Sequence, residues 1–163
     1  MAKTKGMLES LVNTLIEKHH SPPAGKDLRR VVEIIRESQE IINDSDNLRT
    51  VASRYYLLLS SLEELKNRPK RDLKYYGISS DIPFSDSIAM LNEKKSVIFN
   101  QAIDRSYHKA MNRISSLKTM KGRENALSKF YDETCAIIGE YGLPSACFLH
   151  LEEIYRKTLP NIQ

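Results

Sequence analysis

Positive charge is concentrated in one stretch of this 163-residue chain, between Arg105 and Arg123. The stretch contains no Asp or Glu, and its six cations are Arg105, Lys109, Arg113, Lys118, Lys121 and Arg123. The formal net charge of the whole chain is only +4, so this stretch is more positive than the entire molecule. Side chains four and eight positions apart share one face of a helix, which aligns the first three cations. Such a surface suits an anionic partner, either an acidic protein surface or a nucleic-acid backbone.

A simpler explanation covers only part of this stretch. Cations near a helix C-terminus interact favourably with the helix dipole, and that effect falls off within the last turn. It therefore does not account for the absence of acids from residue 105 to residue 123. The alternative that these cations are ordinary solvated surface charge stays open.

Catalytic motifs are scarce in the sequence. It contains no P-loop and no G-x-G-x-x-G, G-x-S-x-G or H-E-x-x-H pattern. Arg105 and His108 lie three positions apart on one predicted helix, where a cation could steady a phosphate while the imidazole moves a proton. A small helical ribonuclease is the least favoured alternative, and the sequence favours a protein that is not an enzyme.

A second basic cluster lies in a segment that Pro69, Gly77 and Pro83 predict to be a loop. Its residues are Lys66, Arg68, Lys70, Arg71, Lys74, Tyr75 and Tyr76. Aromatic rings beside cations suit stacking and phosphate contact with single-stranded nucleic acid. The same composition also suits a loop whose tyrosines cover the end of a bundle while its lysines keep it soluble. A nucleic-acid-binding protein that uses both clusters is therefore an alternative, and it requires the clusters to share a face.

The sequence predicts no metal site and no cofactor. Cys147 and His150 have a C-x-x-H spacing and Cys135 precedes them, but a zinc site needs four ligands and no fourth is apparent. Both cysteines fall near apolar helical positions, where an unpaired cysteine behaves as a small hydrophobic residue. Two cysteines give no disulfide framework, and no segment approaches the ~20 apolar residues of a membrane span. A cytoplasmic location is therefore the expectation.

Hydrophobic residues repeat at helical spacing along nearly the whole chain, and only six glycines and six prolines interrupt them. We therefore expect an all-α protein, a bundle of five to six helices. The apolar stripes predict helices over about 7–20, 28–42, 48–65, 85–118, 123–141 and 145–158. The helix over 85–118 is predicted to be central, and at 1.5 Å per residue it would be about 50 Å long.

The length of the chain is that of a single helical domain, 1–163. Within it we expect an N-terminal three-helix bundle over 1–68, a basic linker loop over 69–84, and a long helix with two packed helices over 85–158. Helical periodicity, the lack of a catalytic pattern and the one-signed stretch favour a non-enzymatic binding module. Such a module, an adaptor, regulator or assembly component, would contact an acidic partner through the basic helix. The sequence leaves the oligomeric state open.

Overall fold

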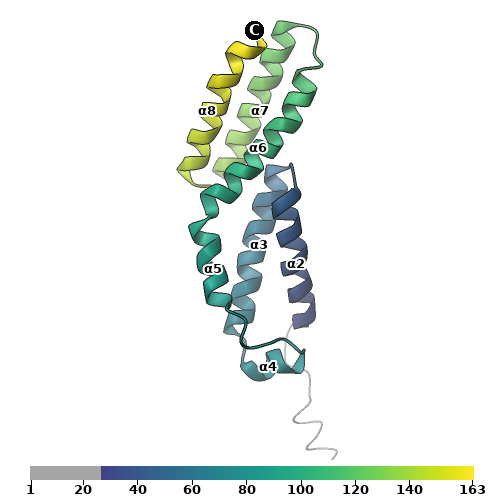
Figure 1. The fold of residues 1–163 in the computed structure, drawn as a ribbon, viewed down its shortest axis with the longest axis vertical. Coiled ribbons are helices and arrows are strands. Elements are labelled where there is room, and N and C mark those ends of the chain that lie inside the picture. The colour runs from purple at the N-terminus through teal and green to yellow at the C-terminus, as the bar shows by residue number, and fades with distance from the viewer. Residues whose placement is uncertain (1–26) are drawn as a thin grey trace, which may run out of the picture.

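The computed structural model describes residues 27–163, which form seven helices and no strand (Figure 1). The prediction of an all-α bundle is confirmed, although this part of the chain holds seven helices rather than five to six. The predicted helix over 7–20, and with it the first helix of the expected three-helix bundle, lies outside the described residues. The helices are α2 (Leu28–Asp44), α3 (Leu48–Asn67), α4 (Lys70–Tyr75), α5 (Phe84–Glu93), α6 (Lys95–Ile114), α7 (Met120–Glu140) and α8 (Ser145–Ile162).

Short polar side chains begin three of these helices. Asp27, Asn47 and Thr119 cap α2, α3 and α7, each accepting a hydrogen bond from a main-chain N–H two or three residues further on. These caps satisfy N–H groups that have no partner within the helix. Gly142 ends α7 in the left-handed region, with φ of 58°, which glycine adopts at no steric cost. The chain can then turn back along α7 as α8.

The prediction of one continuous helix over 85–118 is wrong, because the chain leaves helical geometry at Lys94 and divides into α5 and α6. Figure 1 shows the change of direction between them. The Leu91 carbonyl, which an unbroken helix would pair with the N–H of Lys95, accepts a 2.8 Å hydrogen bond from the Tyr55 hydroxyl. A side chain from α3 thus takes the place of one link in the helix. At the other end α6 stops at Ile114, and residues 115–119 connect it to α7.

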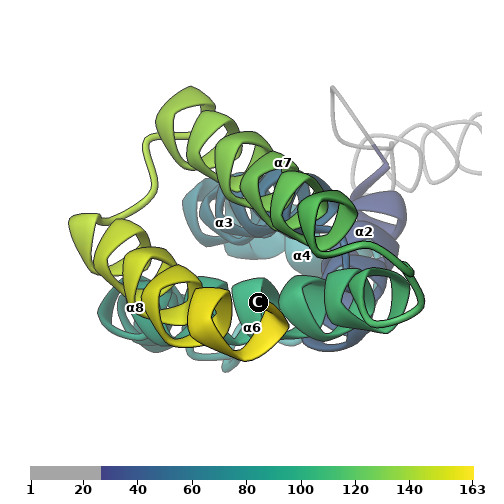
Figure 2. The same ribbon diagram turned by 90° about the horizontal axis from the view of Figure 1, so that it is seen from above.

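The described helices form two halves of an elongated molecule. In Figure 1, α2, α3 and α5 lie side by side with α4 at their far end, and α6, α7 and α8 continue beyond them. Seen from above, α7 lies on one side of the second half, and α6 and α8 lie on the other (Figure 2). Tyr55 and Phe99 are both fully buried where the halves meet, with ring centroids 4.9 Å apart. One hydrophobic core therefore runs through both halves.

The predicted linker loop over 69–84 contains the short helix α4. Leu73 anchors this helix, since its side chain is 4 % exposed and its carbonyl accepts a hydrogen bond from the N–H of Ile78. Phe84 is also buried at the start of α5. The segment is thus attached to the bundle at both ends. None of the helices between residues 27 and 163 combines the length and apolar character needed to cross a bilayer.

Candidate functional site

The structure divides the six cations of residues 105–123 into two groups, and Arg105 belongs to the group with a structural task. Its Nε donates to the carbonyl of Ser45 at 2.9 Å, and its Nη2 donates to the carbonyl of Ile42 at 2.7 Å. Both acceptors lie at the C-terminal end of α2, where carbonyls have no partner within the helix. The guanidinium therefore joins α6 to the end of α2.

Arg123 has the same kind of task at the other end of the stretch. Its Nε donates to the carbonyl of Ile162 and its Nη1 to the carbonyl of Leu117, each at 3.0 Å. These bonds tie the α6–α7 connection to the end of α8. Two donors of each guanidinium therefore bind main-chain carbonyls, so Arg105 and Arg123 hold helices together and are not counted among the free surface cations.

The other four cations lie on the surface. Lys109 forms a 3.2 Å ion pair with Asp46, and both side chains are largely exposed. Arg113, Lys118 and Lys121 are exposed, and their side chains have no hydrogen bond or ion pair with any described residue. We call Arg113, Lys118 and Lys121 the basic corner. They lie between the end of α6 and the first turn of α7, at one end of the molecule (Figure 1).

A groove of about 710 Å³ lies between α6 and α7, next to the basic corner, and we call it the α6–α7 groove. Its floor is mainly apolar and includes Ala110, Ile114, Ala126, Phe130 and Ile137. The α2–α3 turn reaches its edge through Asp46 and Asn47, and cations reach it through Lys109, Arg113 and Lys129. An apolar floor with cations beside it can bind a ligand that is both apolar and acidic.

Some of the residues that line the groove were predicted from the sequence and others were not. Lys109 and Arg113 were expected to bind a partner, and both line it. Lys129, which also lines it, was missed, because it follows the basic stretch and is four residues before Glu133, with which it pairs at 3.8 Å. The only sequence signal for a groove is the small size of Ala110, Gly122 and Ala126. Small residues leave space only if they face one another, and that is visible only in the structure.

The second basic cluster lies at the opposite end of the molecule, around α4 (Figure 1). Lys70, Arg71 and Lys74 line a pocket of about 460 Å³ there, and Arg71 is 3.6 Å from the carboxylate of Asp72. Tyr75 is exposed, whereas Tyr76 is half-buried. The fold places the two basic clusters at opposite ends of the molecule, so a nucleic acid that contacted both would have to run the length of the bundle.

The structure does not assemble the catalytic pair suggested for a ribonuclease. The Arg105 guanidinium is bound to α2, and the exposed imidazole of His108 has no hydrogen bond within residues 27–163. His150 instead forms the closest histidine–carboxylate contact of the described residues, 2.7 Å from Asp104, and it links α8 to α6. The same part of the chain holds no group of three or more His, Cys, Asp or Glu side chains that could bind a metal ion.

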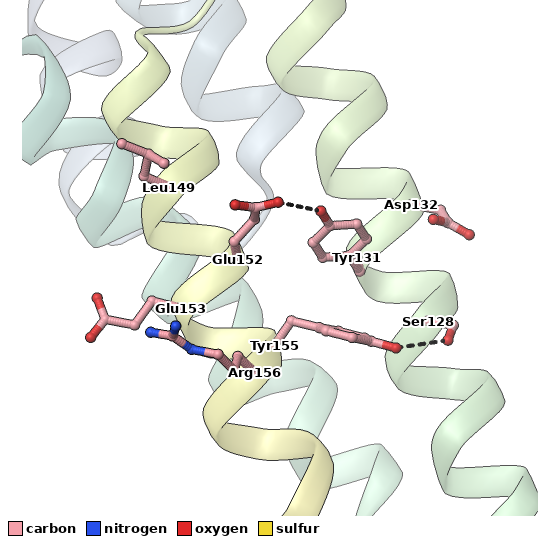
Figure 3. Close-up of a pocket in the computed structure, with 8 residues that line it drawn as sticks. All are labelled: Ser128, Tyr131, Asp132, Leu149, Glu152, Glu153, Tyr155 and Arg156. Carbon is pink, nitrogen blue, oxygen red and sulfur yellow. Dashed lines mark hydrogen bonds between the residues drawn. The ribbon is translucent and has the colours of Figure 1, made fainter.

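A pocket of about 740 Å³ lies between α7 and α8 (Figure 3). The rings of Tyr131 and Tyr155 pack across it with centroids 4.9 Å apart. Burial, aided by the neighbouring Cys135 and Glu152, raises the pKa of Tyr131 to about 12. Figure 3 shows Asp132 and Glu153 pointing away from each other on different sides. The polar groups do not converge on one point, so we assign this pocket to helix packing.

The thiol of Cys147 is predicted to be unreactive in the folded protein. It is fully buried, and burial raises its pKa to about 11 from a reference value of 9.0. At pH 8 the thiolate is then about one part in a thousand, against roughly one in ten in the unfolded chain. In a Cys135→Ala protein, we expect iodoacetamide to alkylate Cys147 about 100-fold more slowly under native conditions than in urea. Equal rates in mass-spectrometric time courses would contradict this burial.

Comparison of the chain with protein-family models, with curated proteins and with solved structures gave no match. The candidate site therefore depends on the geometry and charge of this chain alone.

Proposed function

We propose that this protein is a non-enzymatic helical binding module, an adaptor, regulator or assembly component, that contacts an acidic partner protein through the basic corner. The observation that carries the proposal is that Arg113, Lys118 and Lys121 are exposed and unpaired among the described residues. The nearest acid along the chain is Glu124, whose carboxylate accepts a 2.9 Å hydrogen bond from the Gln163 side chain. This hydrogen bond comes from a neutral amide and leaves the charge of Glu124 in place, but none of the three corner side chains forms an ion pair within residues 27–163.

The surroundings of the corner favour a protein partner over a nucleic acid. The α6–α7 groove beside it offers an apolar floor, which a phosphate backbone cannot use but an apolar side chain can. Lys109, the other cation on that face of α6, is already paired with Asp46. Three free cations make a short electrostatic footprint, whereas nucleic-acid-binding proteins commonly contact many phosphates. The unpaired thiols of Cys135 and Cys147 agree with a reducing compartment, and we propose the cytoplasm.

A display selection with random 16-residue peptides tests the proposal. Peptides are selected for binding to the wild-type protein. The binding of the enriched peptides is then measured with the triple variant Arg113→Glu, Lys118→Glu, Lys121→Glu. We expect the enriched peptides to be rich in Asp and Glu and to bind the variant about 30-fold more weakly in 50 mM salt. This corresponds to about 2 kcal/mol, because each reversal replaces an exposed attraction of a few tenths of a kcal/mol with a repulsion. The difference should shrink as salt rises.

The matched control reverses three cations at the other end of the molecule, with Lys66→Glu, Lys70→Glu and Lys74→Glu. This variant has the same net charge as the first, so a general charge effect would weaken both equally. The proposal is wrong if the two variants bind the selected peptides alike. It is also wrong if a single-stranded oligonucleotide of 16 nucleotides binds the basic corner more tightly than any selected peptide.

A further inference from the structure

We infer that the α6–α7 groove binds an amphipathic α-helix of a partner protein, with its apolar face on the floor of the groove and acidic side chains at the end next to the basic corner. This inference deepens the proposed function and rests on it for the acidic character of the partner. The occupant is identified by the size, the lining and the charge of the groove.

The dimensions of the groove fit a short helix. On α7 the lining runs from Gly122 to Ile137, a distance of about 22 Å at 1.5 Å per residue. On α6 it runs from Ser106 to Ile114, about 12 Å, and Leu117 extends it into the connection. A segment that lies between these two helices along their length would have about three to four turns, or roughly 12 to 15 residues.

The fold leaves this face of α6 and α7 without a covering helix. α2 and α3 pack against α6 where the two halves of the molecule meet, and the turn between them reaches the end of the groove through Asp46 and Asn47. Beyond this turn no described element fills the space between α6 and α7. A helix laid in the groove would bury apolar side chains on both neighbours, as helix-in-groove recognition does elsewhere.

The apolar lining determines the face that the occupant presents. Ile114, Phe130 and Ile137 lie along the floor, and the small side chains of Ala110 and Ala126 leave the space between them. Apolar residues at positions i, i+3, i+4 and i+7 of a helix form one stripe of this length. We therefore assign the contact with the floor to a stripe of aliphatic or aromatic side chains.

The distribution of charge determines where the acidic side chains lie. Away from the corner, the cations at the groove are already neutralised, since Lys109 pairs with Asp46 and Lys129 pairs with Glu133. The unpaired charge is at the corner, where Arg113 both belongs to the corner and lines the groove. Asp or Glu residues of the bound helix are therefore stabilised at that end and gain little at the other.

A synthetic peptide tests the inference directly. The probe is a fluorescent 14-residue peptide with leucines at positions 3, 6, 7 and 10 and glutamates in its last turn. The comparison peptide has the same composition in an order that destroys the helical stripe. In fluorescence anisotropy we expect the first peptide to bind the wild-type protein at least tenfold more tightly than the second. Equal binding of the two peptides, or no binding of either, overturns the inference.

Two variants of α7 locate the binding. Ala126→Trp fills the groove and is expected to weaken peptide binding at least tenfold. Ala136→Trp adds the same ring at an exposed position of the same helix outside the groove, and it should change binding less than twofold. Binding that Ala126→Trp leaves unchanged overturns the inference, even if reversal of the basic corner abolishes binding. In that case the proposed function stands and only the groove is excluded.

Proper folding of the variants is checked by circular dichroism and thermal unfolding. If Ala126→Trp does not fold, amide chemical shifts of the wild-type protein replace it as the readout. The peptide should then shift the amides of Ala110, Ala126 and Lys129 and leave those of α4 unchanged. Shifts confined to other helices overturn the inference. Conversely, groove shifts together with corner variants that bind normally would exclude the proposed electrostatic contact.

Discussion

Replacing Phe99 with alanine is expected to lower the free energy of unfolding by about 3–5 kcal/mol, the usual cost of removing a fully buried phenylalanine. Phe99 is 0 % exposed and packs against Tyr55 with ring centroids 4.9 Å apart. Ala102 and Ile103 beside it on α6 are also fully buried. The surrounding side chains are therefore closely packed and cannot move far enough to fill the cavity that the substitution leaves. The packing contacts that are lost lie where α3 meets α6, so the substitution should weaken the junction between the two halves of the molecule.

Urea unfolding followed by circular dichroism measures this loss. The control is Val97→Ala on the same helix, where the side chain is 54 % exposed and the expected change is below about 0.5 kcal/mol. A loss below about 1 kcal/mol for Phe99→Ala would mean that the junction is not closely packed. Two separate unfolding transitions in this variant, against one in the wild type, would show that Phe99 couples the two halves.

Replacing Arg105 with methionine is expected to lower the free energy of unfolding by about 3 kcal/mol. The variant keeps most of the side-chain volume but loses two hydrogen bonds, to the carbonyls of Ile42 and Ser45. Hydrogen bonds from a charged group contribute about 1.5 kcal/mol or more each, and their loss leaves part-buried carbonyls at the end of α2 without a partner. This loss of free energy of unfolding should exceed the loss caused by replacing any one cation of the basic corner with methionine.

Arg113→Met is the matched control for this prediction. It makes the same chemical change eight residues further along α6, at an exposed side chain without a partner among the described residues. We expect its free energy of unfolding to stay within about 0.5 kcal/mol of the wild type, while its binding to acidic peptides weakens. Similar destabilisation by both variants would remove the distinction between structural and free cations on which the candidate surface depends.

The two structural arginines, Arg105 and Arg123, show how far the sequence could predict the site. A run of cations without acids is visible from residue types alone, and it led to the end of the molecule where the basic corner lies. The acceptors of Arg105 are 60 and 63 residues away in sequence, and one acceptor of Arg123 is 39 residues away. Main-chain carbonyls leave no mark in a sequence, because every residue has one. The pattern therefore could not separate structural cations from free ones.

The same reasoning applies to the long helix. Apolar spacing from Ile88 to Leu117 predicts a single helix, and the spacing is locally correct on each side of Lys94. At the break, the Leu91 carbonyl accepts a hydrogen bond from the Tyr55 hydroxyl, which is 36 residues away in sequence. The short helix α4 was missed for a related reason, since Leu73 stabilises it by packing into a core built from distant helices.

The sequence by itself determined that this protein is helical and that six cations without any acid lie between residues 105 and 123. Both follow from the order of residue types along short distances, since helical periodicity and charge density are local properties. Only the tertiary structure decided which of those cations are free, where the central helix breaks, and that an apolar groove lies beside the basic corner. Each of these depends on groups brought together from separate helices, and the acceptors and spaces that those helices supply exist only once the chain has folded.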